Sequence, residues 1–371
     1  MNKSKKILEL YLFLAIWGTG LALILSQDQD AFLRGKVKYF DKENLPLEKK
    51  MALVREEFKE TGAGDFYLVG YSFMSRNEGC HHGGECSRPY RVTVKNNRIK
   101  MNKNRSAGTE KVGAGDSEPR GEKAAMIILC QALAGGKVID SELVDLDKTY
   151  TFEEIVLYWL GEADTQDSFR FLQGEFKRGN RDLQKSLVFI ISRHENPGTY
   201  DFLSDTAMAD YDQKIRESAI FWLGNYKDAR SLENLKKLYQ EEKELDLKKK
   251  IVFALQMSNH QDALKELIRI AKTENNQLVR KNAIFWLGQK ATEECIKALK
   301  DMVGVIAEDT GVKKSAVFAI SQLPQEKSVP LLIEIATSNS SPEVRKNAIF
   351  WLGQIDDERA IKFFEEILLK K

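Results

Sequence analysis

Residues 279–289 read VRKNAIFWLGQ, and residues 344–354 repeat this stretch letter for letter. A looser copy, IRESAIFWLG, occupies residues 215–224, and YWLG at residues 158–161 is a fourth. The first aromatic residues of the copies are almost evenly spaced along the chain: Tyr158, Phe221, Phe285 and Phe350. A fixed spacing of tens of residues is the mark of a repeat architecture.

The true period is half of this spacing. Between the copies lie FIIS at residues 189–192, FALQ at 253–256 and FAIS at 318–321. The aromatic anchors then fall at positions 158, 189, 221, 253, 285, 318 and 350. Each of the seven expected units has room for two helices of about 10–14 residues joined by short turns.

The repeated pattern resembles HEAT repeats, in particular the HEAT-like repeats of the phycobilin-lyase type, over about residues 152–371. The matching features are the spacing Val-Arg-x-x-Ala-x-x-x-Leu-Gly at 279–288 and 344–353, and the acidic Asp228 and Asp357 a few positions after a copy. The resemblance implies an α-solenoid, and such solenoids mostly serve as binding scaffolds.

Residues 27–148 differ from the repeats and predict a small β-rich domain. Leu47, Met51, Val54 and Phe58 recur at helical spacing and predict one helix within it. Residues 66–73 are aromatic-rich and typical of a strand, and residues 90–101 form a hairpin about Asn96 and Asn97. Residues 103–123 are predicted to be a mobile loop. Residues 125–144 fit a second hairpin, although a helix over 122–133 fits nearly as well. The expected fold class is therefore mainly α: about seven HEAT-like helix pairs over 149–371, preceded by this small α+β domain.

Residues 1–26 combine a basic head with an apolar run that ends before a polar segment. This pattern predicts a secretory signal peptide, with an uncleaved membrane anchor as its main rival and a buried helix as the third interpretation. Either leading interpretation gives an exported, periplasmic or envelope-associated bacterial protein. The membrane would be contacted only through an uncleaved N-terminal segment.

The charge balance bears on the class of partner. Lys and Arg number 57 and Asp and Glu number 55. A nucleic-acid partner bound through bulk positive charge is therefore not expected.

A helical wheel with about 100° per residue predicts which side chains of residues 279–289 are buried. Val279, Ala283, Leu287 and Trp286 fall within one arc of about 100° and form the expected buried stripe. The tryptophans of the copies then pack between units, beside the smaller Ala254 and Ala319 of alternate units. The competing interpretation is an exposed aromatic ladder for sugars or peptides.

Two rows of basic residues accompany the repeats. One row follows the leading aliphatic residue of each unit and is expected to form ion pairs with carboxylates in the turns, such as Asp228, Asp262 and Asp357. Its members are Arg216, Lys248, Arg280, Lys313 and Arg345.

The second row is predicted to point outward, each lysine with a branched aliphatic residue three positions on. The pairs are Lys249 with Val252, Lys281 with Ile284, Lys314 with Val317, and Lys346 with Ile349. Because the second helix of HEAT-like proteins lines the concave surface, these residues predict a groove for an acidic, partly apolar segment of a partner protein. A solvated face whose lysine stems shield the aliphatic residues explains the pattern equally well.

Two clusters are candidates for chemistry. Cys80, His82 and Cys86 lie close together in the sequence; a local disulfide between the two cysteines, a metal site and free thiols are the alternatives. His194 and Glu195 form a dyad like those with which some HEAT-repeat hydroxylases bind a di-iron centre. With only four histidines in the chain, four such dyads cannot be made.

The sequence therefore predicts a scaffold without catalytic residues, cofactor or metal, which binds another protein or peptide. The alternative is a metal-binding or redox function of the N-terminal domain around Cys80 and Cys86. Neither a phosphate-binding loop nor a nucleophile–base motif is apparent in the sequence.

Overall fold

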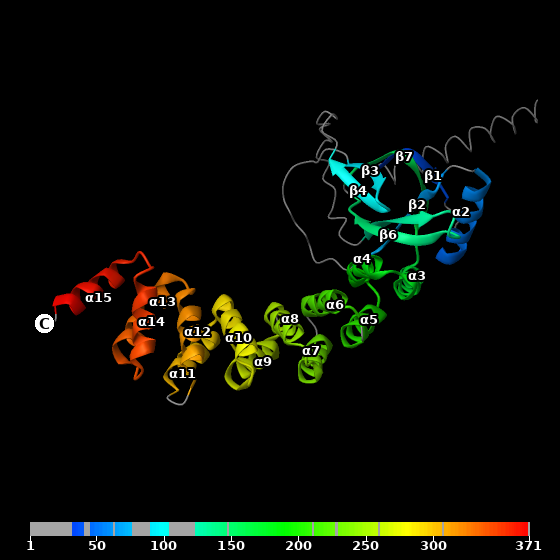
Figure 1. Cartoon of the computed structure of the whole chain (residues 1–371). Coiled ribbons are helices and arrows are strands. Elements are labelled where there is room, and N and C mark those ends of the chain that lie inside the picture. The colour runs from blue at the N-terminus through cyan, green and yellow to red at the C-terminus, as the bar shows by residue number, and fades with distance from the viewer. Residues whose placement is uncertain are drawn as a thin grey trace, which may run out of the picture. The chain divides into compact units, whose positions relative to one another are not determined.

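The computed structural model describes residues 32–40, 45–61, 64–75, 90–103, 123–146, 148–209, 211–226, 229–258, 260–305 and 308–369. The chain divides into two compact units, residues 1–199 and residues 200–371 (Figure 1). The expected signal segment, most of the expected loop 103–123, and the Cys80–Cys86 cluster lie outside the described residues. In the described part, no helix is both long and apolar enough to cross a membrane.

The first unit is built on a seven-stranded mixed sheet with the order β4-β3-β7-β2-β5-β6, and β1 pairs with β7. The strands are β1 (Leu33–Tyr39), β2 (Phe66–Met74), β3 (Tyr90–Lys95), β4 (Arg98–Lys103), β5 (Lys123–Gln131), β6 (Lys137–Val144) and β7 (Tyr150–Glu162). The long β7 pairs in parallel with β3 near its start, with β2 near its end, and with β1 along its other side. One strand therefore holds the sheet together.

Both predicted hairpins are present. The β3–β4 hairpin turns at Asn96 and Asn97, whose φ angles are 52° and 58°, a conformation that asparagine tolerates better than most residues. The second hairpin joins β5 to β6, so the alternative of a helix over 122–133 is wrong. Its turn contains Gly135 and Gly136, both with positive φ.

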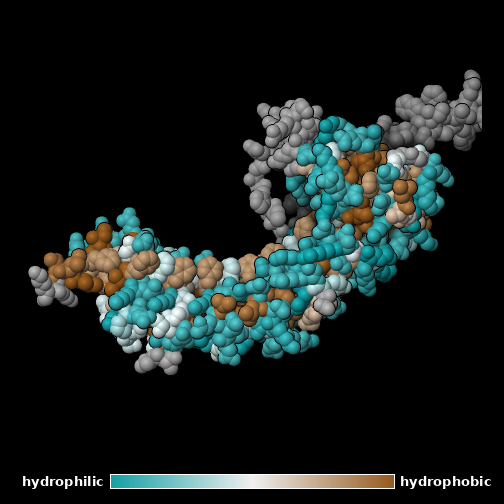
Figure 2. Space-filling view, in the orientation of Figure 1, coloured by the Kyte–Doolittle hydropathy of each residue, from teal (hydrophilic) through white to brown (hydrophobic). Residues whose placement is uncertain are grey.

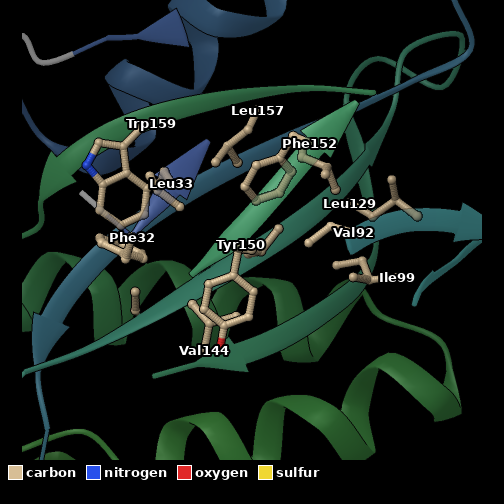
Figure 3. Packing of buried hydrophobic residues seen from close by; sticks show 13 residues of the cluster. Phe32, Leu33, Val92, Ile99, Leu129, Val144, Tyr150, Phe152, Leu157 and Trp159 are labelled. Atoms are coloured by element: carbon tan, nitrogen blue, oxygen red, sulfur yellow. The ribbon is translucent and has the colours of Figure 1, made fainter. Parts of the chain in front are cut away.

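The sheet curls until its edge strands meet. The backbone N–H of Ile99 in β4 donates to Asp140 Oδ2 in β6 at 2.8 Å. The main hydrophobic cluster lies on the inner side of this curl and includes Phe152, Leu157 and Trp159 (Figure 3). These three side chains are almost fully shielded from solvent, so β7 is also the centre of the core.

Helix α2 (Leu47–Thr61) packs its predicted apolar face onto the other side of the sheet. Its Leu47, Met51, Val54 and Phe58 are buried, which confirms their helical spacing, and the Phe58 ring stacks on Tyr67 at 4.6 Å. Two more helices, α3 (Thr165–Arg178) and α4 (Arg181–Ser192), belong to the same unit.

The expectation that helices begin near residue 152 is wrong. Residues 150–162 form β7, and its Leu157, Tyr158, Trp159 and Leu160 are all buried. A strand covered on both faces reads as a continuous apolar run, so periodicity alone cannot distinguish it from a short buried helix. YWLG at 158–161 is therefore no HEAT-like helix, and the β-rich region continues to Glu162.

The second unit is a stack of helix pairs (Figure 1). The first helices are α5 (Gly198–Met208, whose first turn precedes residue 200), α7 (Ala229–Glu241), α9 (Gln261–Thr273), α11 (Glu293–Gly304) and α13 (Gln325–Ser338). The second helices are α6 (Gln213–Asn225), α8 (Leu245–Met257), α10 (Gln277–Lys290), α12 (Thr310–Ser321) and α14 (Pro342–Leu352), followed by α15 (Glu358–Leu369). This arrangement confirms the predicted α-solenoid.

The buried side of a second helix is wider than the wheel predicted. Val279, Ala283 and Leu287 of α10 are fully buried as expected, but so is Ile284. Gly288 is buried too, so the shielded arc spans about 180° of the wheel. The reason is that α10 packs against its own first helix and against the second helices on both sides. Trp286 lies at the edge of this arc.

Candidate interaction surface of the second helices

Eight aromatic side chains lie at the surface of successive second helices. We call them the aromatic row: Phe221, Trp222, Phe253, Phe285, Trp286, Phe318, Phe350 and Trp351. Phe350 is 55% exposed and Phe221 is 36% exposed, and the other six are half-buried. Apolar surface recurs along the second helices in the space-filling view (Figure 2). The expectation that the tryptophans of the second helices pack between units is confirmed for Trp286 and Trp351, but they are half-buried and not fully buried core residues.

Ring contacts connect members of the row. Phe253 in α8 lies 4.8 Å from Trp286 in α10, and Phe318 in α12 lies 5.0 Å from Trp351 in α14. Within α6, α10 and α14, the adjacent phenylalanine and tryptophan rings meet edge to face at 5.0–5.1 Å. Because these rings contact one another, the aromatic row is held in place without being fully buried.

Two kinds of junction between neighbouring second helices alternate along the stack. At α6–α8, a Cβ added to Gly224 would lie 2.8 Å from the Ala254 Cα. At α10–α12, a Cβ added to Gly288 would lie 2.9 Å from the Ala319 carbonyl oxygen. The phenylalanine–tryptophan contacts occupy the α8–α10 and α12–α14 junctions instead. This alternation explains why the sequence repeats most closely every two units.

Two glycines of the second helices permit this close approach. Gly224 and Gly288 lie inside α6 and α10, and neither has positive φ. The left-handed residue after α10 is Ala291, with φ 51°. Glycine is required at 224 and 288 because the neighbouring backbone leaves no room for a side chain.

The predicted groove stays a prediction, and the structure shows only where its residues lie. Its lysines reach the surface: Lys346 is exposed, and Lys249, Lys281 and Lys314 are half-buried. We call these four residues the lysine row. Lys249 pairs with Asp246 at 3.1 Å, and Lys314 pairs with Glu343 at 3.1 Å.

The aliphatic half of the prediction is wrong. Val252, Ile284 and Val317 are fully buried, and Ile349 is half-buried. They fill the junctions between adjacent second helices, which a wheel for one isolated helix does not represent. The apolar component of this surface is the aromatic row instead.

The other basic row forms the expected ion pairs, but with different acidic partners. We call this series of ion pairs the arginine ladder. Arg280 pairs with Glu308, and its Nε and Nη2 donate to the carbonyls of Ala271 and Lys272, each at 2.9 Å. Arg216 pairs with Glu242 and donates to the Ala207 carbonyl at 2.9 Å. Each arginine therefore joins the end of its own first helix to a carboxylate that follows the next first helix.

The expected acidic partners of this ladder lie elsewhere. Asp262 pairs with Lys265, Asp357 pairs with Arg359, and Asp228 lies outside the described residues. The observed partners are Glu242, Glu274 and Glu308, each of which comes directly or shortly after a first helix. A glutamate at the end of each first helix was therefore the sequence feature that indicates these ion pairs.

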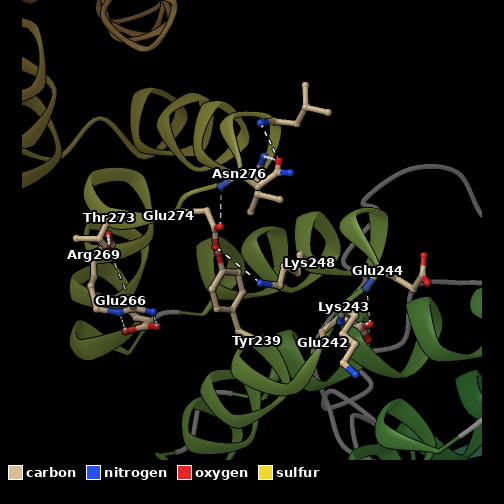
Figure 4. Close-up of polar contacts among 12 residues, drawn as sticks. Tyr239, Glu242, Lys243, Glu244, Lys248, Glu266, Arg269, Thr273, Glu274 and Asn276 are labelled. Carbon is tan, nitrogen blue, oxygen red and sulfur yellow. Dashed lines mark hydrogen bonds and ion pairs between the residues drawn. The ribbon is translucent and has the colours of Figure 1, made fainter. Parts of the chain in front are cut away.

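Glu274 is the centre of the best-connected step of the ladder (Figure 4). It accepts from the Tyr239 hydroxyl and from the Asn276 backbone N–H, and Lys248 lies 3.8 Å away. Burial acts to raise the pKa of Glu274, but these donors outweigh it and the pKa is lowered. The Lys248 ammonium also lies 4.9 Å from the Tyr239 ring centroid.

His194 belongs to the first unit and is a packing residue. Its ring stacks on Phe73 at 3.9 Å and is fully buried, whereas Glu195 is exposed. Nε2 lies 2.7 Å from Ser168 Oγ, and Nδ1 lies 3.0 Å from the Ile190 carbonyl, so Nδ1 carries the proton and donates. Burial lowers the pKa of His194 to about 4. Among the described residues, no three His, Cys, Asp or Glu side chains are grouped to hold a metal.

The predicted cysteine chemistry stays a prediction, because Cys80, His82 and Cys86 lie outside the described residues. The other two cysteines, Cys130 and Cys295, are buried free thiols, and burial raises the pKa of Cys130 to about 12. Thiol titration with and without reductant, together with metal analysis, distinguishes a disulfide at Cys80–Cys86 from a metal site.

The sequence contained a signal for the aromatic row. Phe285 falls nearly opposite the predicted buried stripe on the wheel, and a phenylalanine recurs at this position in every second helix. Five outward phenylalanines at one repeat position are more than the scattered apolar residues of an ordinary surface.

Comparison with known proteins supports the repeat assignment. A family model for HEAT repeats matches residues 200–288, 264–335 and 305–371. No curated protein sequence matches the chain. The structure of human deoxyhypusine hydroxylase in complex with glycerol is similar at 18% identity over 55% of this chain and 79% of its own, with a TM-score of 0.25. The X-ray structure of YibA from Escherichia coli is similar at 18% identity over 50% of this chain and 68% of its own, with a TM-score of 0.32. At these TM-scores, neither similarity supports a functional argument.

Proposed function

Residues 200–371 are HEAT repeats, and from this premise we propose that the chain is a non-catalytic scaffold that binds another protein along its second helices. The aromatic row is the observation that carries this proposal. Each of the five second helices in the described part of the second unit presents a phenylalanine at the same position, none of them fully buried. A row of apolar rings at the surface of a solenoid is typical of a protein-interaction site.

The lysine row favours an acidic partner. Lys249, Lys281, Lys314 and Lys346 each lie four residues before a phenylalanine of the aromatic row, and therefore on the same side of the helix. A partner segment with apolar and acidic residues complements rings and ammonium groups together. The scaffold is thus proposed to bind an acidic, partly apolar segment of another protein.

The proposal includes a location outside the cytoplasm, as a periplasmic or envelope-associated protein. Its support is the sequence of residues 1–26, a basic head followed by an apolar run. Fractionation of cells that express the tagged chain, with N-terminal sequencing of the mature protein, tests both export and cleavage.

Cross-linking in intact cells tests the binding surface. A tagged full-length chain is compared with Phe285→Ser/Phe350→Ser, which interrupts the aromatic row. The matched control is Leu278→Ser/Val305→Ser, because these two side chains are 58% and 49% exposed but lie outside the row. We expect the row variant to lose partners that the wild type and the control both retain. A row variant that retains every partner contradicts the proposal.

A further inference from the structure

Two asparagine–tryptophan pairs in the second helices have polar atoms without a hydrogen-bond partner. These atoms are the Oδ1 of Asn282 and Asn347 and the Nε1 of Trp286 and Trp351. In α10 and in α14 the asparagine lies four residues before the tryptophan, on the same side of the helix. Each pair therefore places an unpaired acceptor beside an unpaired donor. The two pairs lie two repeat units apart.

Packing does not account for these residues. Phenylalanine fills a half-buried aromatic position without an N–H group, and asparagine is unfavourable inside helices. Asn282 is not the N-cap of α10, because Asn276 caps that helix. The equivalent positions in α6 and α12 hold Ser218 and Ser315, and Ser315 donates to the Gly311 carbonyl within its own helix.

Unpaired polar atoms shielded from water are costly unless a ligand pairs them. All four side chains are only half-buried, so each of these shielded polar atoms belongs to a side chain that reaches the surface. One acceptor beside one donor matches a peptide group, which carries one N–H and one C=O.

We infer that Asn282 with Trp286, and Asn347 with Trp351, bind the main chain of an extended segment of the partner protein. Each asparagine Oδ1 accepts a backbone N–H, and each indole N–H donates to a backbone carbonyl. This inference rests on the proposed function and adds the conformation of the bound segment and the atoms that hold it.

The spacing of the two pairs sets the length of segment between them. Adjacent packed helices lie about 8–10 Å apart, so α10 and α14, with α12 between them, are about 16–20 Å apart. An extended chain advances about 3.3 Å per residue, so about five or six residues connect the two pairs. Alternate side chains of such a segment point to opposite sides, so the apolar ones contact the aromatic row while acidic ones reach Lys281 and Lys346.

Fluorescence anisotropy with synthetic peptides tests the inference on the full-length chain. The probe is a labelled mixture of dodecapeptides, long enough to reach both pairs, with Asp or Glu alternating with Leu, Ile or Phe. A mixture with Lys and Arg in place of the acidic residues is the charge control, and a mixture methylated at its backbone nitrogens is the main-chain control.

Two double variants remove the proposed contacts, Asn282→Ala/Asn347→Ala and Trp286→Phe/Trp351→Phe. The second keeps the rings and deletes only the indole N–H groups. Ser218→Ala/Ser315→Ala is the matched control at the equivalent positions, and circular dichroism verifies that every variant is folded.

We expect the acidic mixture to bind and each double variant to weaken binding about tenfold or more, with the serine control unchanged. The methylated and basic mixtures should bind at least tenfold more weakly than the acidic one. The inference is wrong if the acidic mixture does not bind the wild-type chain. It is also wrong if both double variants bind this mixture as tightly as the wild type and methylation of its backbone nitrogens does not weaken binding. The scaffold proposal is judged separately, because its cross-linking test depends on Phe285 and Phe350, which these variants leave intact.

Discussion

Trp159 and Trp286 occupy opposite environments although both stand in the sequence Trp-Leu-Gly. Trp159 is 1% exposed in the curled sheet and contacts Phe32 edge to face at 5.3 Å. Trp286 is half-buried at the surface of α10, against Phe253 and Phe285. The neighbours, and not the local motif, decide whether an indole stabilises a core or presents a surface.

His194 makes the stability of the first unit dependent on pH. Its folded-state pKa is lowered to about 4 from 6.5, so between these values the unfolded chain binds more protons than the folded chain. Unfolding is therefore favoured as pH falls from 7 to 4, by up to about 3 kcal/mol at about 1.36 kcal/mol per pKa unit. Urea unfolding at pH 7, 6, 5 and 4 measures this loss.

The variant His194→Gln is the control for this titration. It lowers stability at pH 7, because the stack on Phe73 and the bond to Ser168 are changed, but it removes the titrating group. The fall in stability between pH 7 and 4 should become shallower than in the wild type. An equal fall in both proteins excludes His194 as its cause.

At the scale of the element, the close α10–α12 junction predicts the effect of filling Gly288. An alanine Cβ there lies 2.9 Å from the Ala319 carbonyl oxygen, so Gly288→Ala forces the two helices apart. We expect a loss of about 1–3 kcal/mol in the free energy of unfolding, although alanine favours the helix itself. In Gly304→Ala, where the new Cβ meets nothing within 4 Å, stability should rise by up to about 1 kcal/mol. Thermal unfolding of both variants checks the contrast, and equal effects contradict the close approach.

The arginine ladder predicts a second contrast between elements. Arg280→Ala removes a pair whose side chains are only 15% and 12% exposed, together with two bonds to helix-end carbonyls. We expect a loss of about 3 kcal/mol, because Glu308 is left partly buried without its partner. Lys327→Ala breaks the exposed pair with Glu293 and should change stability by at most about 1 kcal/mol. Urea midpoints of the two variants test this order; a reversed order refutes the role of Arg280.

For the whole molecule, the repeat period was readable from the sequence because the phenylalanine anchors recur in every helix pair. The β-rich region, its hairpins and the face of α2 were also predictable, since alternation, turn residues and helical spacing are local signals. The identity of β7 was not, because a strand buried on both faces looks like any apolar run.

The interaction surface was only partly predictable for a related reason. The wheel placed the lysine row correctly but put Ile284 outside and Trp286 inside, since it took the helix to be buried along one stripe. Neighbours on both sides of each second helix widen the buried arc and shift its centre. The positions of those neighbours are a property of the assembled stack and not of one segment.

The accessibility of the tryptophans tests the central claim, that the aromatic row lies at the surface and that a partner covers it. The full-length chain is labelled with 5-fluorotryptophan, and each fluorine resonance is assigned by a single Trp→Phe replacement. A water-soluble gadolinium chelate should broaden the resonances of Trp286 and Trp351 strongly and leave that of Trp159 sharp, and the acidic peptide mixture should then protect Trp286 and Trp351. If Trp286 and Trp351 are as insensitive as Trp159, or stay equally broadened at saturating peptide, the account is contradicted.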